Sequence, residues 1–148
     1  MARSALSDTY GEFTVPTLEY LRRGGRITRV QEVVGNLLGV RPVIAFQSGK
    51  LEVLRRMRQG QTLNSMIAAL ERRFESDPVD VAVGLAGRDP VRLAELRAAV
   101  DASQLNVREK RFQPIGCVIG AHTRPGMMAV TATRCRPLPK QSAGSETP

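Results

Sequence analysis

Residues 42–58 read PVIAFQSGKLEVLRRMR, and they are the most informative stretch about the fold. It opens with an apolar run, carries the turn pair Ser48-Gly49 at its centre, and continues into a partly alternating segment. This pattern is typical of two antiparallel strands joined by a tight turn. Because side chains alternate along a strand, we expect Arg56 and Arg58 on one face of the second strand and Arg55 on the other.

The clearest helix pattern follows directly, over residues 62–76. It has an apolar stripe at helical spacing, formed by Leu63, Met66, Ile67, Leu70 and Phe74. Beyond it, Asp89 followed by Pro90 predicts a helix start, with the helix running to about Ala102. The composition predicts further strands over residues 78–87, 105–112 and 127–135.

The segments that precede the hairpin alternate between strand and helix signals. Glu12–Thr17 predicts a short strand, and the following LEYLRR predicts a short helix that stops at Gly24. A second helix is expected from Thr28, which forms a capping box with Gln31, to Gly39. The segment 114–126 fits either a strand or a short helix.

These elements predict an α/β fold of the α+β kind. We expect a two-layer sandwich with a mixed, largely antiparallel sheet and helices mainly on one face. Residues 1–11 are expected to form a flexible N-terminus, residues 12–136 the domain, and the polar residues 137–148 a disordered tail.

The composition narrows the class of protein. The 148 residues carry a net charge of +8, but the arginines are spread from Arg3 to Arg136, and aromatic residues make up only 4%. Such scattering favours solvated surface charge over a nucleic-acid site, although a basic domain that binds nucleic acid or an acidic protein stays an alternative. With no secretory or membrane-spanning apolar run, we expect a cytoplasmic protein. We interpret Cys117 and Cys135 as reduced and structural, and expect no metal site or cofactor.

Two short motifs could hold an anion. Gly24-Gly25-Arg26 is either a simple helix cap with a surface arginine or a turn whose bare backbone and guanidinium bind a negative group. The loop GAHTRPG, residues 120–126, holds the only histidine, His122, which is either structural or part of a cleft. The arginines of residues 55–58 are more simply explained as charges that protect a strand edge.

Three stretches together resemble one family. LEYLRRGGRI (18–27), LLGVRPVIAFQSGKLEVLRRMR (37–58) and PIGCVIGAHTRPG (114–126) look like the C-terminal half of DegV proteins, from about Phe13 to Val130. The resemblance implies a lipid-binding protein that takes a long-chain fatty acid. In that family some members present the acyl carboxylate to a fatty acid kinase and do not catalyse the transfer alone, so we expect no enzyme activity here.

The resemblance also implies roles for individual residues. Arg26, His122 and Thr123 match the family's carboxylate-binding positions, and Arg58 matches a kinase-contact position. Bare backbone for close ligand approach is expected at Gly24, Gly25 and Gly126. We therefore expect Arg26 and His122 to lie close together, and one face of the domain to be unusually apolar.

This sequence departs from the family pattern in three places. Arg124 stands where the family usually has glycine, which either strengthens anion binding or blocks entry. Gln61 stands where a basic residue is common. The family's N-terminal domain has no counterpart here, so we expect a fragment or truncated form that works with a separate N-terminal domain or as a homo-oligomer. A decayed remnant without a ligand is the remaining alternative.

Overall fold

The structure is a computed structural model that describes residues 8–25 and 39–135. The sheet is built from β1 (Thr9–Thr14), β2 (Val40–Gln47), β3 (Lys50–Arg58), β4 (Pro78–Leu85), β5 (Asn106–Pro114) and β6 (Met128–Arg134). The described helices are α2 (Glu19–Arg23), α3 (Gln59–Phe74), α4 (Pro90–Asp101) and α5 (Cys117–Thr123).

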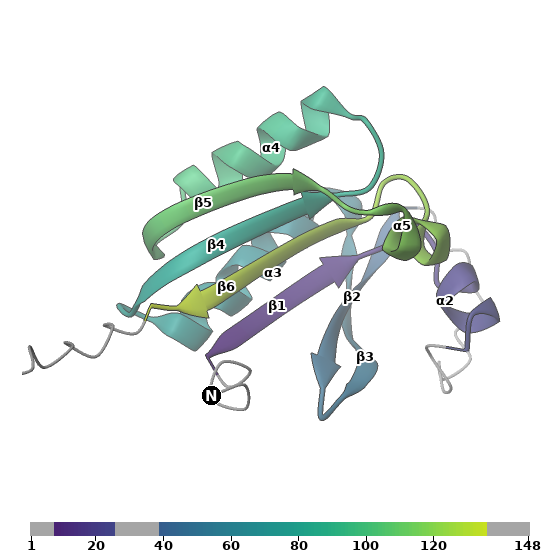
Figure 1. Ribbon diagram of the computed structural model, residues 1–148, viewed down its shortest axis with the longest axis horizontal. Coiled ribbons are helices and arrows are strands. Elements are labelled where there is room, and N and C mark those ends of the chain that lie inside the picture. The colour runs from purple at the N-terminus through teal and green to yellow at the C-terminus, as the bar shows by residue number, and fades with distance from the viewer. Residues whose placement is uncertain (1–7, 26–38, 136–148) are drawn as a thin grey trace, which may run out of the picture.

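The six strands form one sheet in the order β3-β2-β1-β6-β4-β5. Four neighbouring pairs are antiparallel, and only β4 and β5 run parallel, joined by the crossover helix α4. Figure 1 shows α3 behind the sheet, α4 beside its β5 edge, and α2 and α5 next to each other beyond the end of β1. This mixed, largely antiparallel α/β sandwich confirms the predicted fold class.

The main core lies between the sheet and helices α3 and α4. Along β4 the residues Val79, Val81, Val83 and Leu85 are buried against it, while the intervening residues are half-buried on the opposite face. The predicted stripe of α3 is confirmed, because Met66, Ile67, Leu70 and Phe74 are buried and Leu63 packs beside them. Both helices therefore pack through their apolar residues on the same face of the sheet.

The opposite face of the sheet carries a second, smaller core. Its buried members are Val15, Leu21, Ile44, Ala86 and Met127. Leu21 comes from α2, and Met127 comes from the loop after α5. The small cluster therefore seats the two short helices on one end of this face.

The predicted hairpin is confirmed, with positive φ at both turn residues, Ser48 and Gly49. The pairing shifts by one residue between Val43 and Ile44, so Leu54 is an extra residue in β3. A bulge of this kind reverses the side-chain alternation beyond it. As a result, Val53 joins the small cluster, whereas Arg55 points to the side of α3.

Arg55 is the centre of a part-buried polar network between β1, β3 and α3. Its Nη1 and Nη2 donate to Glu12 Oε1 and Oε2 at 2.9 and 2.6 Å. Its Nε donates to Ser65 Oγ at 2.7 Å, and Tyr10 OH donates to Glu12 Oε1 at 2.9 Å. Hydrogen bonding to the Glu12 carboxylate raises the pKa of Arg55, so its guanidinium stays charged.

Several details differ from the sequence-based expectation. The first strand spans Thr9–Thr14 and not Glu12–Thr17, because residues 9–11 pair with β6; they are not a flexible terminus. The ambiguous segment 114–126 contains the helix α5. Cys117 is exposed on that helix, so a packing role for it is wrong; it and Cys135 are unpaired.

The helix predicted from Thr28, the boundary at residue 136 and the tail 137–148 lie outside the described residues. Within the described ranges, no helix has the length and apolar character to cross a membrane.

Replacing Arg55 by methionine should destabilise the domain by about 3–5 kcal/mol, since it leaves the Glu12 carboxylate buried without its cation. The double variant Glu12→Leu/Arg55→Met should recover most of that loss. Urea unfolding followed by circular dichroism measures both. The control Arg56→Met, an exposed neighbour on β3, should stay within about 0.5 kcal/mol of wild type. A single Arg55 variant as stable as the control would contradict this account.

The ionisation of Tyr10 makes the stabilising effect of the network depend on pH. Burial, together with the hydrogen bond and charge of Glu12, raises the pKa of Tyr10 to about 12. The folded state holds this proton more tightly than the unfolded state, so its stabilising effect is complete below pH ~10 and declines as the pH rises towards 12. In an ultraviolet titration, Tyr10→Phe should remove the later phenolate step, while Tyr20→Phe should leave it in place.

Candidate functional site

The glycine pair that follows α2 ends the helix as predicted. Gly24 is the C-cap residue, with its N–H donating to Tyr20 O at 2.9 Å. Gly25 follows with φ +68°, a conformation that glycine adopts without steric cost. Glu19 lies in the first turn, and Arg22 and Arg23 lie in the last, which suits the helix dipole. The backbone therefore turns sharply directly after α2.

His122 faces this turn from α5. A Cβ added at Gly24 would lie 3.0 Å from His122 Nδ1 and 3.4 Å from Cε1. The imidazole thus packs against bare backbone, and no hydrogen bond to a described residue engages its nitrogens. The side chain is half-buried, and an imidazole nitrogen can donate or accept a hydrogen bond.

Arg124 ends α5 in a left-handed conformation, with φ +67°. Its guanidinium lies 4.4 Å from the centroid of the Tyr20 ring, a cation–π contact that joins the α5 loop to α2. Arg124 therefore lies on the Tyr20 ring instead of extending freely. Thr123 next to it is buried, and its hydroxyl donates to Ile119 O at 2.9 Å. A carboxylate contact from Thr123 would require that hydroxyl to rotate.

The loop that leads from α5 into β6 is packed closely at Gly126. The φ of Gly126 is +94°, and a Cβ there would come within 3.2 Å of Pro16 Cγ. Its N–H donates to Ala86 O at 2.9 Å, which ties the loop to the end of β4. Glycine is required here by backbone geometry as well as by space.

The floor beneath these polar groups is the small apolar cluster. Val15 and Leu21 are buried there, and Phe13, Leu18 and Ile115 pack around them. The polar group at His122 and this apolar cluster thus come from neighbouring segments, and a site for an amphipathic ligand combines two such parts.

The expectation of an unusually apolar face has partial support. Phe46, two residues beyond Ile44 on β2, is 68% exposed on the side of the small cluster. On α5, Val118 is 74% and Ile119 is 53% exposed. Large apolar side chains left in water often mark a contact surface.

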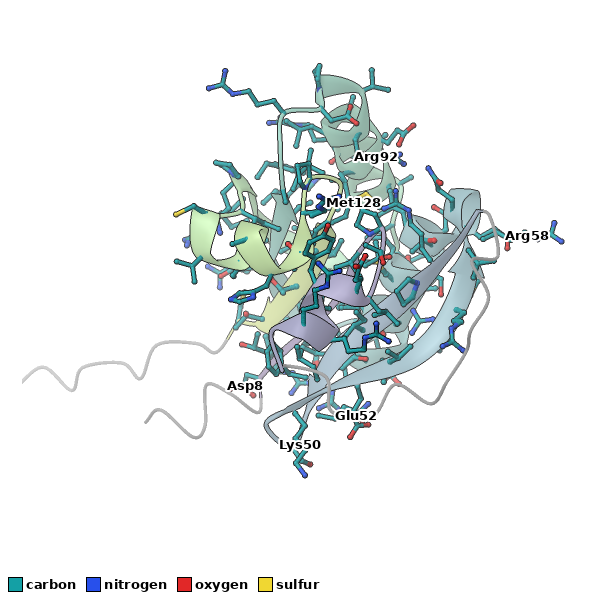
Figure 2. The ribbon with its side chains drawn as sticks, turned by 90° about the vertical axis from the view of Figure 1, so that its right-hand side faces the viewer. Asp8, Lys50, Glu52, Arg58, Arg92 and Met128 are labelled. Carbon is teal, nitrogen blue, oxygen red and sulfur yellow. The ribbon has the colours of Figure 1, made fainter. Side chains whose placement is uncertain are left out.

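The predicted site residues separate into two groups. Gly24 and His122, far apart in the sequence, are in contact, and Gly25 and Gly126 lie in the segments that adjoin them. Arg26 lies outside the described residues, so its distance from His122 stays a prediction. Arg58 is exposed at the amino end of α3 on the sheet edge, and Figure 2 shows it extending away from the body of the protein. Gln61 is exposed in the first turn of the same helix.

Sequence reasoning missed two residues of this region, Tyr20 and Arg41. Tyr20 precedes Gly24 by four residues and receives the Arg124 guanidinium, and its aromatic side chain in a short helix was the available signal. Arg41 Nη1 donates to Gly126 O at 3.0 Å. Only its position before Pro42 marked it, and that does not reveal a contact 85 residues further along the chain.

Many of the basic side chains are engaged in ion pairs. Examples are Arg23 with Glu19, Arg92 with Glu95, Arg111 with Glu109 and Arg134 with Asp77. In the described ranges, no group of three or more His, Cys, Asp or Glu side chains is arranged to hold a metal ion.

Comparison with known proteins defines the class first. Residues 2–134 match the family profile described as "Uncharacterised protein, DegV family". A DegV domain-containing protein from Streptomyces coelicolor is 37% identical over 142 residues, covering 89% of this chain and 47% of the relative. One from Clostridium perfringens is 31% identical and covers 83% and 44%.

A solved structure gives the same result. The match is titled "Fatty Acid Binding of a DegV family Protein from Thermus thermophilus"; it is 32% identical, has a TM-score of 0.76, and covers 87% of this chain and 46% of that one. The chain belongs to the DegV family. It spans about half the length of the curated relatives it matches.

Replacing Gly24 by alanine should displace the His122 ring by a few tenths of an ångström, because the new Cβ would meet Nδ1 at 3.0 Å. His122 is the only histidine, so its imidazole signals in an NMR spectrum report the shift without overlap. The matched control is Gly60→Ala on α3, where a Cβ meets nothing within 4 Å. Unchanged His122 signals in Gly24→Ala, with both variants folded, would contradict the contact.

Proposed function

We propose that this chain is a fatty-acid-binding domain whose site lies between α2 and α5. The observation that carries the proposal is the contact of the His122 ring with Gly24 above the apolar cluster. The 32% identical relative from Thermus thermophilus, named for fatty acid binding, supports the same ligand class. A carboxylate and a long apolar chain match the two parts of this site.

The carboxylate is assigned to His122 and Arg26, with Thr123 beside them. A ring N–H and a guanidinium are donors suited to a carboxylate, and charge-assisted hydrogen bonds of this kind are the strong ones. The turn at Gly24 and Gly25 presents bare backbone beside them, so the head group can approach closely.

The function is binding rather than catalysis. The head-group residues can hold a carboxylate, and the Thr123 hydroxyl donates to Ile119 O and not to the His122 ring, so the described residues offer no activated nucleophile there. Transfer of a phosphoryl group to the carboxylate is therefore assigned to a separate fatty acid kinase, with exposed Arg58 on the β3 edge as a contact for it.

A second domain is expected to complete the site. The chain spans about half the length of its relatives, and the small cluster leaves side chains such as Phe46 in water. Each methylene of an acyl chain contributes about 0.8 kcal/mol when fully buried. A half-open site buries only some of them, so it should bind a fatty acid weakly until a DegV N-terminal domain or a second copy covers the rest.

The test is a titration with a fluorescent long-chain fatty acid. This chain alone should bind weakly or not at all, and adding the N-terminal half of the Streptomyces coelicolor relative should restore binding. In the restored complex, Arg26→Ala and His122→Ala should each weaken binding about tenfold or more, which corresponds to about 1.4 kcal/mol. Arg108→Ala, on an exposed position of β5, is the matched control and should have little effect.

Two results would contradict the proposal. One is equal binding by the Arg26, His122 and Arg108 variants. The other is steep salt-dependent binding of a nucleic acid with no fatty acid binding in either form, which would favour the basic-domain alternative. Tight stoichiometric binding by the chain alone would instead show that no second domain is needed.

A further inference from the structure

Arg41 reaches from the core side of the sheet to the loop that follows His122. It lies near the amino end of β2, opposite Met57 on β3, and two residues before the buried Val43. From there its Nη1 donates to Gly126 O at 3.0 Å. The contact joins β2 to a loop 85 residues later in the chain.

The charge of Arg41 is not balanced by an acid among the described residues. It takes part in no described ion pair, whereas its neighbour Arg92 pairs with Glu95 at 3.2 Å. Burial, and to a smaller extent the charge of Arg92, lowers the pKa of Arg41. Holding a half-buried cation beside a second cation is unfavourable, so the contact it makes must offset that cost.

The Gly126 peptide is held from two directions. Its N–H donates to Ala86 O at the end of β4, and its carbonyl oxygen accepts from Arg41. The backbone at Gly126 has a φ of +94°, and it sits only two residues after the Arg124 guanidinium that stacks on Tyr20. The segment 124–126 is therefore fixed to β4, β2 and α2.

His122 precedes this fixed segment by two residues. It occupies the last turn of α5, a helix of only seven residues that cannot hold a position by itself. The placement of the imidazole against Gly24 thus depends on where the segment 124–126 is anchored.

We infer that Arg41 is a positioning residue, which anchors the loop through the Gly126 carbonyl and so holds the His122 ring against Gly24. Its value for fatty acid binding rests on the proposed function, but the anchoring itself does not. A guanidinium suits this task because it remains charged when half-buried and is rigid at its end. A lysine at this position can donate to the same oxygen but lacks the planar guanidinium. It should therefore restore the position of the His122 ring only in part.

The test compares Arg41→Met with Arg41→Lys, using the NMR signals of the single imidazole. The methionine variant should keep the circular dichroism spectrum of wild type and yet shift or broaden the His122 signals, and the lysine variant should fall between the two. Arg56→Met is the matched control, an exposed arginine of the same hairpin, and should leave the His122 signals unchanged.

Wild-type protein supplies a second measurement that needs no variant to fold. The guanidinium hydrogens of Arg41 should exchange with water more slowly than those of Arg56, because one of them is held by the Gly126 carbonyl. Equal exchange rates, or His122 signals that stay at their wild-type positions in folded Arg41→Met, would overturn the inference.

The binding titration separates this inference from the proposed function. With the added N-terminal domain, Arg41→Met should weaken fatty acid binding about tenfold. If Arg41→Met shifts the His122 signals but even the wild-type protein binds no fatty acid, the anchoring by Arg41 stands and the proposed function is rejected. Binding by wild type and Arg41→Met with equal affinity, and with unshifted signals, would reject the anchoring and leave the function intact.

Discussion

The ion pair between Glu12 and Arg55 fixes the central strand on which both faces of this domain depend. The Glu12 side chain is only 1% exposed, and both of its oxygens accept hydrogen bonds from one guanidinium. A buried carboxylate is tolerated only when such partners satisfy it. Since Arg55 also donates to Ser65 on α3, one pair locks strands β1 and β3 and the long helix into a single register.

The residues that follow β1 in the chain explain the location of the site. Its carboxyl end continues into the buried Val15, then into Pro16, which packs beside Gly126, and then into α2. Any shift in the β1 register would move α2 and the turn at Gly24 away from His122. The polar network on one face of the sheet thereby supports a site that draws its apolar floor from the other face.

The two faces of the sheet have different roles. The face under α3 and α4 is a closed core, in which the odd-numbered residues of β4 are buried. The other face has a small cluster at one end, covered by two short helices, and exposes Phe46 elsewhere. A domain with one fully covered and one partly covered face is suited to binding a ligand or a second domain on the partly covered face.

The arginines of this chain also divide into two kinds, which net charge does not distinguish. Some of the exposed ones, such as Arg23 and Arg111, form ion pairs with acids on their own element. Arg124 and Arg41 instead hold the segment that follows His122, one through an aromatic ring and the other through a carbonyl oxygen.

Local patterns in the sequence were enough to predict several elements of the fold. The stripe of α3, the Ser48-Gly49 turn, the Asp89 cap and the Gly24 stop are each decided by residues within one turn or one strand, and each is confirmed. The family resemblance, carried by the motifs around Gly24 and His122, is confirmed as well.

The contacts between distant residues depend on tertiary packing, which local patterns do not encode. The extra residue Leu54 turns Arg55 towards Glu12, although strict alternation along β3 would place it with Leu51 and Val53. The segment 114–126 fits a strand or a helix by its local pattern, and in the structure it contains the helix α5, which packs against α2. Likewise, the bond from Arg41 to Gly126 exists because antiparallel pairing brings the amino end of β2 to the end of β1, and no spacing in the sequence records that closeness.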